Sequence, residues 1–250
     1  MWLYFCWKKY LYVIYFRNDN EIGGKTLKSI DEMRKSYNSF IERQRVGYEM
    51  TAAMIGYIVE KMKRANIVSG NVSVSGRIKS FKSAYENTGK KAVDDCFGIR
   101  IIGPMEDLKK IQAEIEKNFK VDATKDHSRK ANSSYNAIHE MLHMHAKYTA
   151  NSGINPETFP EVEIQYWDEE LREKCLYGEL SYANYKSKDL IAISERLEND
   201  RENVLSDLPV FYTIEGNKIK RLSKQDSLYK MYPEIKRIEE GKRQGEEAAI

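Results

Sequence analysis

The chain has 250 residues, of which 41% are hydrophobic, which is enough for one sizeable core with or without a helical appendage. The net charge is only +3, although 32% of residues are charged, so no global field draws in nucleic acid and any basic function must come from local clustering. The three cysteines, Cys6, Cys96 and Cys175, form no CxxC pair; this excludes a readable disulfide framework or cysteine zinc module and fits a reducing cytoplasm.

The N-terminal stretch, residues 1–16, is strongly apolar and aromatic, with Lys8 and Lys9 in its middle. It is shorter than the roughly 20 apolar residues that a membrane-spanning helix needs. It also lacks the basic start and the small-residue cleavage site of a signal peptide. We expect a segment that packs against the protein, with docking of a partner or membrane attachment as the alternatives.

A long helix is predicted to follow. Ser29 and Glu32 have the spacing of a capping box, and the helical pattern continues to about residue 65, with a break expected near Gly47. Apolar residues recur at spacings of three and four in its first half: Ile30, Met33, Tyr37, Phe40 and Ile41.

Strand patterns come next. Residues 72–79 alternate, which predicts a strand with one buried and one open face. The apolar run 97–102 predicts a central strand covered on both faces. An amphipathic helix over 108–119, an extended piece from 121 and a basic loop over 125–132 complete this half.

The second half mixes both periods. Residues 135–145 fit either a strand or a helix, whereas 162–167 alternate as a strand does. Helical patterns cover 169–182, 187–205 and the charged end from 233, and 209–214 is a further strand. The predicted fold class is therefore α/β: a mixed β-sheet flanked by helices, with a helical N-terminal lead (1–70), a core (71–186) and a helical C-terminal portion (187–250) in one structural domain.

Basic and hydroxyl side chains gather at and after the first predicted strand: Arg77, Lys79, Ser80, Ser83, Lys90 and Lys91. Arg77 and Lys79 project to the same face because strand side chains alternate. An arginine offers a planar fork and a lysine a point charge, so the cluster can bind a polyphosphate. The alternative is a solvated basic strand end.

Two carboxylates lie near predicted strands, one just before a strand and one inside a strand. Asp95 directly precedes the apolar run 97–102, and Glu163 lies within the strand 162–167. A magnesium ion takes one or two protein oxygens together with phosphate oxygens and water. Each acid alone fits a salt bridge or a strand-end cap, but with the cation cluster they predict a magnesium site.

Tyr135 and His139 are four residues apart and share a face of a strand. An aromatic ring stacks on a nucleobase, and an imidazole bonds a base or a phosphate. A core tyrosine and a satisfied histidine are the alternative.

Read in order, five segments resemble the successive motifs of RelA/SpoT-type (p)ppGpp synthetases: Arg77-Ile-Lys79-Ser80, Asp95-Cys-Phe-Gly98-Ile-Arg100, Tyr135-Asn-Ala-Ile-His139, Glu163-Ile-Gln165 and Tyr185-Lys186. The match covers about residues 72–186. The resemblance implies a nucleotidyltransferase-like mixed sheet. It also implies an enzyme that transfers the β,γ-pyrophosphate of ATP to the 3′-hydroxyl of GDP or GTP.

The resemblance also implies roles for single residues. ATP and its phosphates would contact Arg77, Lys79, Ser80, Ser83, Lys90, Lys91 and Arg100. Asp95 would hold Mg²⁺, the one cofactor implied, and Glu163 would be the second metal ligand or the base that takes the 3′-hydroxyl proton. Tyr135 would stack on the acceptor base, and the remaining acceptor residues would be His139, Asn132, Gln165, Arg129 and Lys130.

The chain departs from the family pattern on the acceptor side. Tyr166-Trp167-Asp168 follow Glu-x-Gln where the family continues with a hydrophobic residue, Arg and Thr, and Tyr182-Ala183 stand where long members carry His-Trp. The chain resembles the small stand-alone members, some of which are toxins that modify the 3′ CCA end of tRNA. The expected partners are thus ATP, a guanine nucleotide or tRNA as acceptor, and an antitoxin protein, without a membrane.

Two alternatives remain. The segment His139-Glu140-Met141-Leu142-His143 matches H-E-x-x-H, which on a helix places two imidazoles beside a glutamate base, as in a zinc metallopeptidase. Its alternation suits a strand instead, and no third ligand follows at a recognised spacing. A non-catalytic RNA-binding protein on the same sheet is the second alternative; the two carboxylates argue against it, because acids near a phosphate site weaken binding without a metal.

Overall fold

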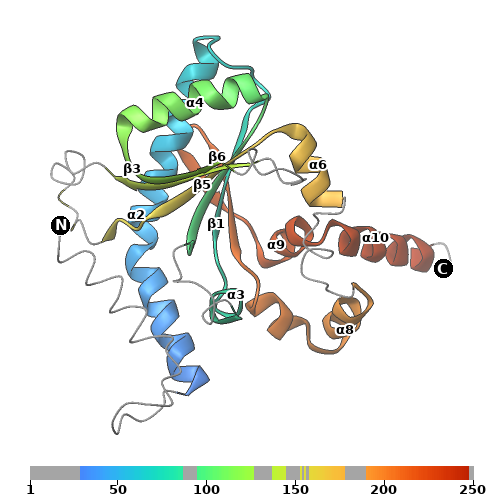
Figure 1. Cartoon of the computed structure of the whole chain (residues 1–250). Helices are drawn as coiled ribbons and strands as arrows, with labels where there is room; N and C mark the ends of the chain where they lie inside the picture. Colours follow the sequence, from blue (N-terminus) through green and yellow to red (C-terminus); the bar gives the residue numbers. More distant parts are fainter. Residues whose placement is uncertain are drawn as a thin grey trace, which may run out of the picture.

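The computed structural model describes residues 29–86, 95–126, 137–144, 153, 155, 158–177 and 190–247 (Figure 1). Within these residues a single β-sheet is flanked by helices. The apolar stretch 1–16, for which we expected packing against the protein, lies outside them.

Helix α2 (Ile30–Arg64) begins at the predicted capping box. The Ser29 hydroxyl accepts from the Glu32 amide (3.2 Å), and the Glu32 carboxylate accepts from the Ser29 amide (2.8 Å). The helix is continuous, so the break expected near Gly47 is wrong. Gly47 instead allows a close approach of the chain, because a Cβ there would lie 2.1 Å from the carbonyl oxygen of Thr158.

The sheet has seven strands in the order β3-β4-β5-β2-β1-β6-β7. The strands are β1 (Ser73–Ile78), β2 (Phe97–Ile102), β3 (Phe119–Asp126), β4 (Ile138–Met144), β5 (Val162–Trp167), β6 (Val210–Glu215) and β7 (Lys218–Arg221). Strands β2 and β5 pair in parallel and the other neighbours are antiparallel, which confirms the predicted α/β mixed sheet. Strand β2 is central, as its continuous apolar sequence indicated, and the ambiguous segment around His139 is a strand.

The remaining helices are α3 (Phe81–Glu86), α4 (Met105–Asn118), α6 (Glu169–Tyr177), α8 (Leu190–Ser206), α9 (Lys224–Met231) and α10 (Pro233–Glu247). Helices α8, α9 and α10 gather on one side of the sheet (Figure 1), around a small apolar cluster that includes Ile193, Leu228 and Ile235. The portion expected to be helical, 187–250, also supplies β6 and β7 to the sheet. None of the described helices is both long and apolar enough to cross a membrane.

The sheet has a closed face and an open face. Helix α2 covers the closed face: the Tyr48 hydroxyl, fully buried, donates to the carbonyl of Gly98 (2.9 Å), and its ring packs on Phe97 and Tyr212. Because strand side chains alternate, the neighbours of these core residues point to the other side of the sheet, the open face. The open face carries polar side chains on the same strands beside a small apolar cluster that includes Trp167 and Leu171.

Candidate functional site

The sheet register brings most of the described predicted site residues onto the open face. Arg77 of β1 pairs with Gly98 of β2, and Gly98 pairs with Glu163 of β5. One step along, Arg100 of β2 pairs with Gln165 of β5. Side chains at paired positions point to the same face. Four residues from three strands, separate in sequence, therefore share one surface.

Strand β4 adds His139 to this surface, because His139 pairs with Gln165. Gly98 lies between Arg77 and Glu163 and has no side chain to separate them. A Cβ on Gly98 would lie 4.0 Å from Arg77 Nε and 3.8 Å from the Glu163 carbonyl oxygen. The Arg77 guanidinium thus extends over Gly98 towards the carboxylate strand.

A chain of hydrogen bonds holds the Glu163 side chain. His139 Nδ1 lies 3.0 Å from Glu163 Oε1, and Gln165 Nε2 donates to Glu163 Oε2 (2.8 Å). Arg100 Nε and Nη2 donate to Gln165 Oε1 (3.2 and 2.9 Å), and the Arg100 guanidinium lies 3.4 Å from the centre of the Trp167 ring. Both carboxylate oxygens of Glu163 are therefore oriented by neutral or cationic donors.

These contacts decide the charge of Glu163. Burial by itself raises the pKa of this carboxyl, but the hydrogen bond and charge of His139, the Gln165 amide and the charge of Arg77 lower the pKa to about 2. Glu163 is thus ionised at neutral pH. An ionised Oε1 accepts a hydrogen bond, so His139 Nδ1 is the donor of this pair.

Lys79 and Asp95 form a second pair at the adjoining strand ends. Lys79 Nζ lies 2.7 Å from Asp95 Oδ1 and 2.9 Å from Oδ2. The lysine side chain is only 8% exposed, whereas the aspartate is 38% exposed. The Lys79 backbone is fixed as well, since its amide donates to the Cys96 carbonyl and its carbonyl accepts from the Tyr37 hydroxyl. The Lys79 side chain is therefore buried, fixed in position and paired with Asp95. It is not a solvated residue at the end of a strand.

Ser80 and Ser83 lie where the chain turns into α3. The Ser80 hydroxyl accepts from the Ser83 amide (3.2 Å), a local contact that starts this short helix. Both serines line a small pocket with Arg196 and Asp207 of the C-terminal portion. The predicted hydroxyl groups thus face a recess that apolar residues of the C-terminal portion, such as Ile193 and Leu208, also line.

Asp95 and Glu163 carry the donor atoms that magnesium prefers, namely carboxylate oxygens. Strands β2 and β5 are parallel, and Asp95 precedes by three residues the Gly98 that pairs with Glu163. The two acids therefore lie towards the same end of neighbouring strands. Glu163 is ionised and Asp95 is partly exposed, so these two acids supply the type of oxygen ligand that a magnesium ion would need.

Several predicted residues fall outside the described part of the chain: Lys90, Lys91, Arg129, Lys130, Asn132, Tyr135 and the Tyr185-Lys186 pair. Their assignments to ATP or to the acceptor stay predictions from the sequence.

The metallopeptidase alternative does not hold, because H-E-x-x-H lies on strand β4. Glu140 points to the closed face, where it is fully buried and accepts hydrogen bonds from Gln112 Nε2 (2.7 Å) and the Tyr166 hydroxyl (2.8 Å). Burial also raises the pKa of this carboxyl. Glu140 therefore cannot act on a metal held by His139 and His143 on the open face.

Sequence reasoning missed Lys230, a residue of α9. Its Nζ lies 5.3 Å from the centre of the Phe211 ring, and Phe211 pairs with Arg77 in the β1–β6 ladder. Burial and the charge of Arg100 lower the pKa of Lys230 to about 8. A third cation thus approaches Arg77 and Arg100 from the C-terminal helices. It lies far along the chain in an ordinary helix, so no motif marks it.

No protein-family profile and no curated protein sequence matches the chain. Among solved structures, small alarmone synthetase 1 from Bacillus subtilis is 17% identical over 69% of this chain and 93% of that chain, with a TM-score of 0.46. A GTP pyrophosphokinase family protein from Streptococcus pneumoniae is 17% identical over 66% and 85%, with a TM-score of 0.47. Small alarmone synthetase 2 from Bacillus subtilis is 17% identical over 68% and 97%, with a TM-score of 0.42.

Proposed function

We propose that this chain is a magnesium-dependent pyrophosphokinase that transfers the β,γ-pyrophosphate of ATP to the ribose 3′-hydroxyl of a guanine nucleotide, GDP or GTP. The observation that carries the proposal is the meeting, on the open face, of the ionised Glu163 carboxylate with Arg77, Arg100 and His139. The order of the sequence motifs around these residues supports the same chemistry.

The cations of the open face would bind the triphosphate. Arginine binds phosphate oxygens through a planar fork, and lysine through a compact charge. Arg77 offers the fork, and Lys79 a point charge that is already held in place by backbone and side-chain contacts. Such preorganised donors cost little reorganisation when charge develops on the phosphoryl oxygens.

Asp95 and Glu163 are the residues that would hold the magnesium ion. When bound, the ion offsets charge on the phosphoryl oxygens. Of the two roles that the family resemblance implies for Glu163, metal ligand fits better than base. A carboxyl with a pKa of about 2 is a weak base near neutral pH, because a general base works best with a pKa close to the working pH.

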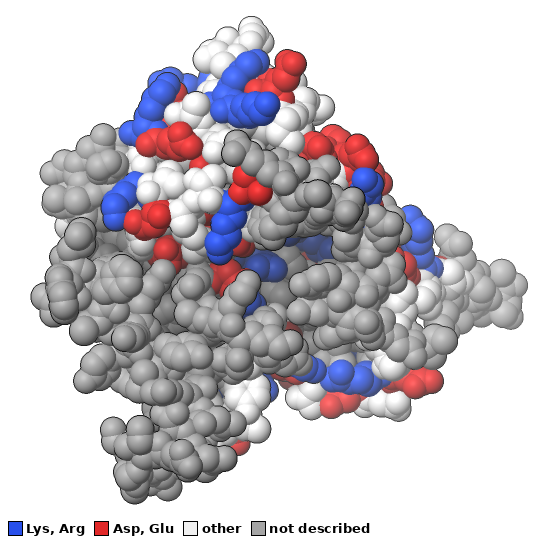
Figure 2. Space-filling view, in the orientation of Figure 1, with Lys and Arg blue, Asp and Glu red and all other residues white. Residues whose placement is uncertain are grey.

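The small net charge of the chain, +3, favours a free nucleotide as the acceptor. Figure 2 shows Lys and Arg interspersed with Asp and Glu over the described part of this view. An RNA acceptor needs several cations that follow its phosphates, whereas a single nucleotide needs only a few. Transfer to the 3′ CCA end of tRNA, with toxicity that an antitoxin relieves, is the other outcome that the test below distinguishes.

The test is a transfer assay with ATP labelled in its γ-phosphate and four acceptors in parallel: GDP, GTP, AMP and total tRNA. We expect the label on GDP or GTP, with a shallow dependence on salt. Label on tRNA, a steep loss with added salt and a defect in an Arg129→Ala/Lys130→Ala double variant would support the tRNA reading instead. Absence of label on every acceptor would contradict the pyrophosphokinase itself.

A further inference from the structure

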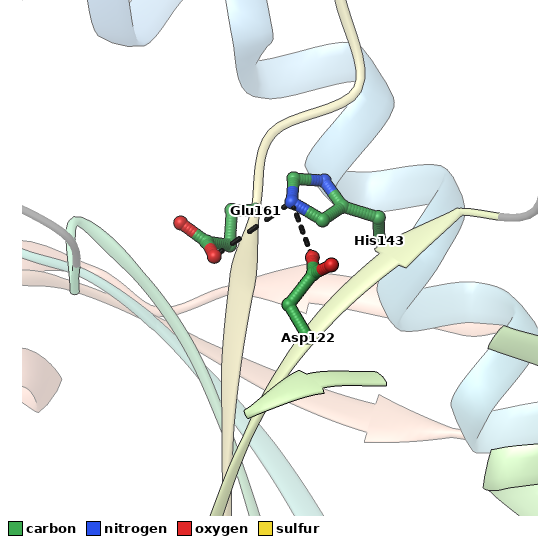
Figure 3. Close-up of side chains that lie close together, drawn as sticks. All are labelled: Asp122, His143 and Glu161. Atoms are coloured by element: carbon green, nitrogen blue, oxygen red, sulfur yellow. Dashed lines mark ion pairs between the residues drawn. The ribbon is translucent and has the colours of Figure 1, made fainter. Parts of the chain in front are cut away.

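A second cluster of titratable side chains lies on the open face, near the edge of the sheet. Asp122 of β3, His143 of β4 and Glu161, which directly precedes β5, bring one ligand atom each within 4.8 Å of one another. His143 Nε2 lies 2.8 Å from Asp122 Oδ2 and 3.7 Å from Glu161 Oε1. Figure 3 shows both carboxylates directed at the same ring nitrogen.

The fold builds this cluster through a local irregularity. The register between β3 and β4 shifts between Val121 and Ala123, so Asp122 is the extra residue of a β-bulge. Bulges re-aim side chains that regular pairing would send elsewhere. On the other side, continuing the β4–β5 pairing by one residue beyond Leu142 and Val162 places His143 opposite Glu161. The three side chains therefore meet only because of this pairing.

The geometry suits a cation as well as an ion pair. A ring nitrogen carries either one hydrogen or one lone pair, so it serves one carboxylate and not two. In a tetrahedral zinc site, bonds of about 2.0–2.2 Å place neighbouring ligand atoms about 3.4 Å apart. The distances of 2.8 and 3.7 Å from Nε2 lie on either side of that value. Small movements would convert the cluster into a ligand set.

His143 and Glu161 are also sheltered enough to be preorganised, whereas Asp122 is an exposed residue whose Oδ1 lies 2.7 Å from Lys120 Nζ. The side chains of Glu161, His143 and Asp122 are 11%, 17% and 28% exposed. Partial burial limits their rotamers, while the remaining exposure leaves a path for an ion and for water as a further ligand.

We propose that Asp122, His143 and Glu161 bind a divalent transition-metal ion, and zinc is the probe for this site. Imidazole nitrogen favours zinc, whereas magnesium prefers an all-oxygen shell. The bound ion would fasten the edge strand β3 to β4 and to the start of β5. This site is separate from the magnesium ligands proposed above and does not depend on the pyrophosphokinase proposal.

The experiment titrates ZnCl₂ into chelator-treated protein by isothermal calorimetry. Because Asp95 and Glu163 could also take zinc, the protein is Glu163→Gln, in which one of those ligands is lost. We expect one zinc per chain at this site. Asp122→Asn, Glu161→Gln and His143→Ala, each added to this background, should lower the affinity at least tenfold, because each removes one ligand.

Asp126→Asn, on the same strand as Asp122, is the matched control and should bind zinc as the parent does. Thermal unfolding is the second readout, since an ion that binds the folded state raises Tm. Zinc should raise Tm in the parent but not in the three ligand variants, and His143→Gln replaces His143→Ala if the alanine variant does not fold. No zinc binding, unchanged affinity in the ligand variants, or equal binding of Mg²⁺ would each overturn the proposal.

Discussion

Two histidines on strand β4 share one face of the sheet but have different surroundings. His139 contacts Glu163, whose other oxygen is bonded by Gln165, so a single carboxylate is surrounded by donors. His143, four residues later, faces two carboxylates, those of Asp122 and Glu161. The first arrangement stabilises one negative charge; the second brings two carboxylates to one ring nitrogen, with Lys120 paired to Asp122. The same residue type on one strand would thus serve the proposed polyphosphate site in one place and the proposed cation site in the other.

The largest effect on pyrophosphate transfer should come from removing the charge of Glu163, the partner of His139. Glu163→Gln is expected to lower pyrophosphate transfer by about a thousandfold or more, because loss of a metal ligand costs several kcal/mol of charge stabilisation. Asp95→Asn should act in the same direction. The measurement is the transfer rate with labelled ATP and GDP.

Glu170→Gln is the control for charge alone. Glu170 is exposed at the start of α6, where it pairs with Lys174. Full turnover in the Glu163→Gln and Asp95→Asn variants would remove both residues from the site.

The next largest effect should be on the pH dependence of the free energy of unfolding, to which Glu163, the partner of His139, contributes. The pKa of Glu163 is about 2 in the folded chain and 4.5 as its ordinary value. Because the folded pKa is the lower one, Glu163 contributes stability above about pH 4.5, and this contribution is lost as the pH falls through about 2. The contribution of Glu163 to the free energy of unfolding is on the order of 3 kcal/mol.

Urea unfolding at pH 7 and pH 3 measures the contribution of Glu163 to stability. The free energy of unfolding of wild type should fall more steeply between these pH values than that of Glu163→Gln, in which the carboxyl does not titrate. Equal slopes in the two proteins would show that His139 and Gln165 do not hold the carboxylate as described.

The phosphate cations should give a smaller effect than the metal ligands. Arg77→Ala and Lys79→Ala are each expected to weaken ATP binding about 10- to 100-fold, since hydrogen bonds to charged groups contribute about 1.5–3 kcal/mol. Lys79→Arg should not fully restore binding, because a planar fork does not replace a point charge. ATP affinity is measured by calorimetry, with zinc affinity as a readout that Arg77→Ala should leave unchanged. Unchanged ATP affinity in both alanine variants would show that Arg77 and Lys79 do not bind the phosphates of ATP.

The smallest effect is expected from replacing His139, and it distinguishes the role of His139 from that of His143. His139→Ala removes one hydrogen bond to Glu163 and should slow transfer about tenfold, a loss of about 1.4 kcal/mol. The same variant should bind zinc like its parent, whereas His143→Ala should lose zinc. If His139→Ala and His143→Ala weaken zinc binding equally, the two sites are one, and the comparison fails.

Local patterns in the sequence were enough for the elements themselves. The run 97–102 and the alternation 162–167 have the same bounds as β2 and β5, because hydrophobic period reports directly on strand conformation. The capping box at Ser29 was also readable, since it depends on residues three apart. Strand β7 and helix α9 were missed, because four and eight residues carry too little periodic signal.

The sequence by itself thus determined the mixed sheet, the order of the motifs and the residue types at the candidate site. Only the tertiary structure decided which side chains meet: Lys79 with Asp95, His139 with Glu163, Lys230 near Arg100, and Asp122 with His143 and Glu161. The physical reason is that strand pairing fixes side-chain facing across residues distant in the chain. A one-residue shift, such as the bulge at Asp122, changes the face of a side chain without any mark in local composition.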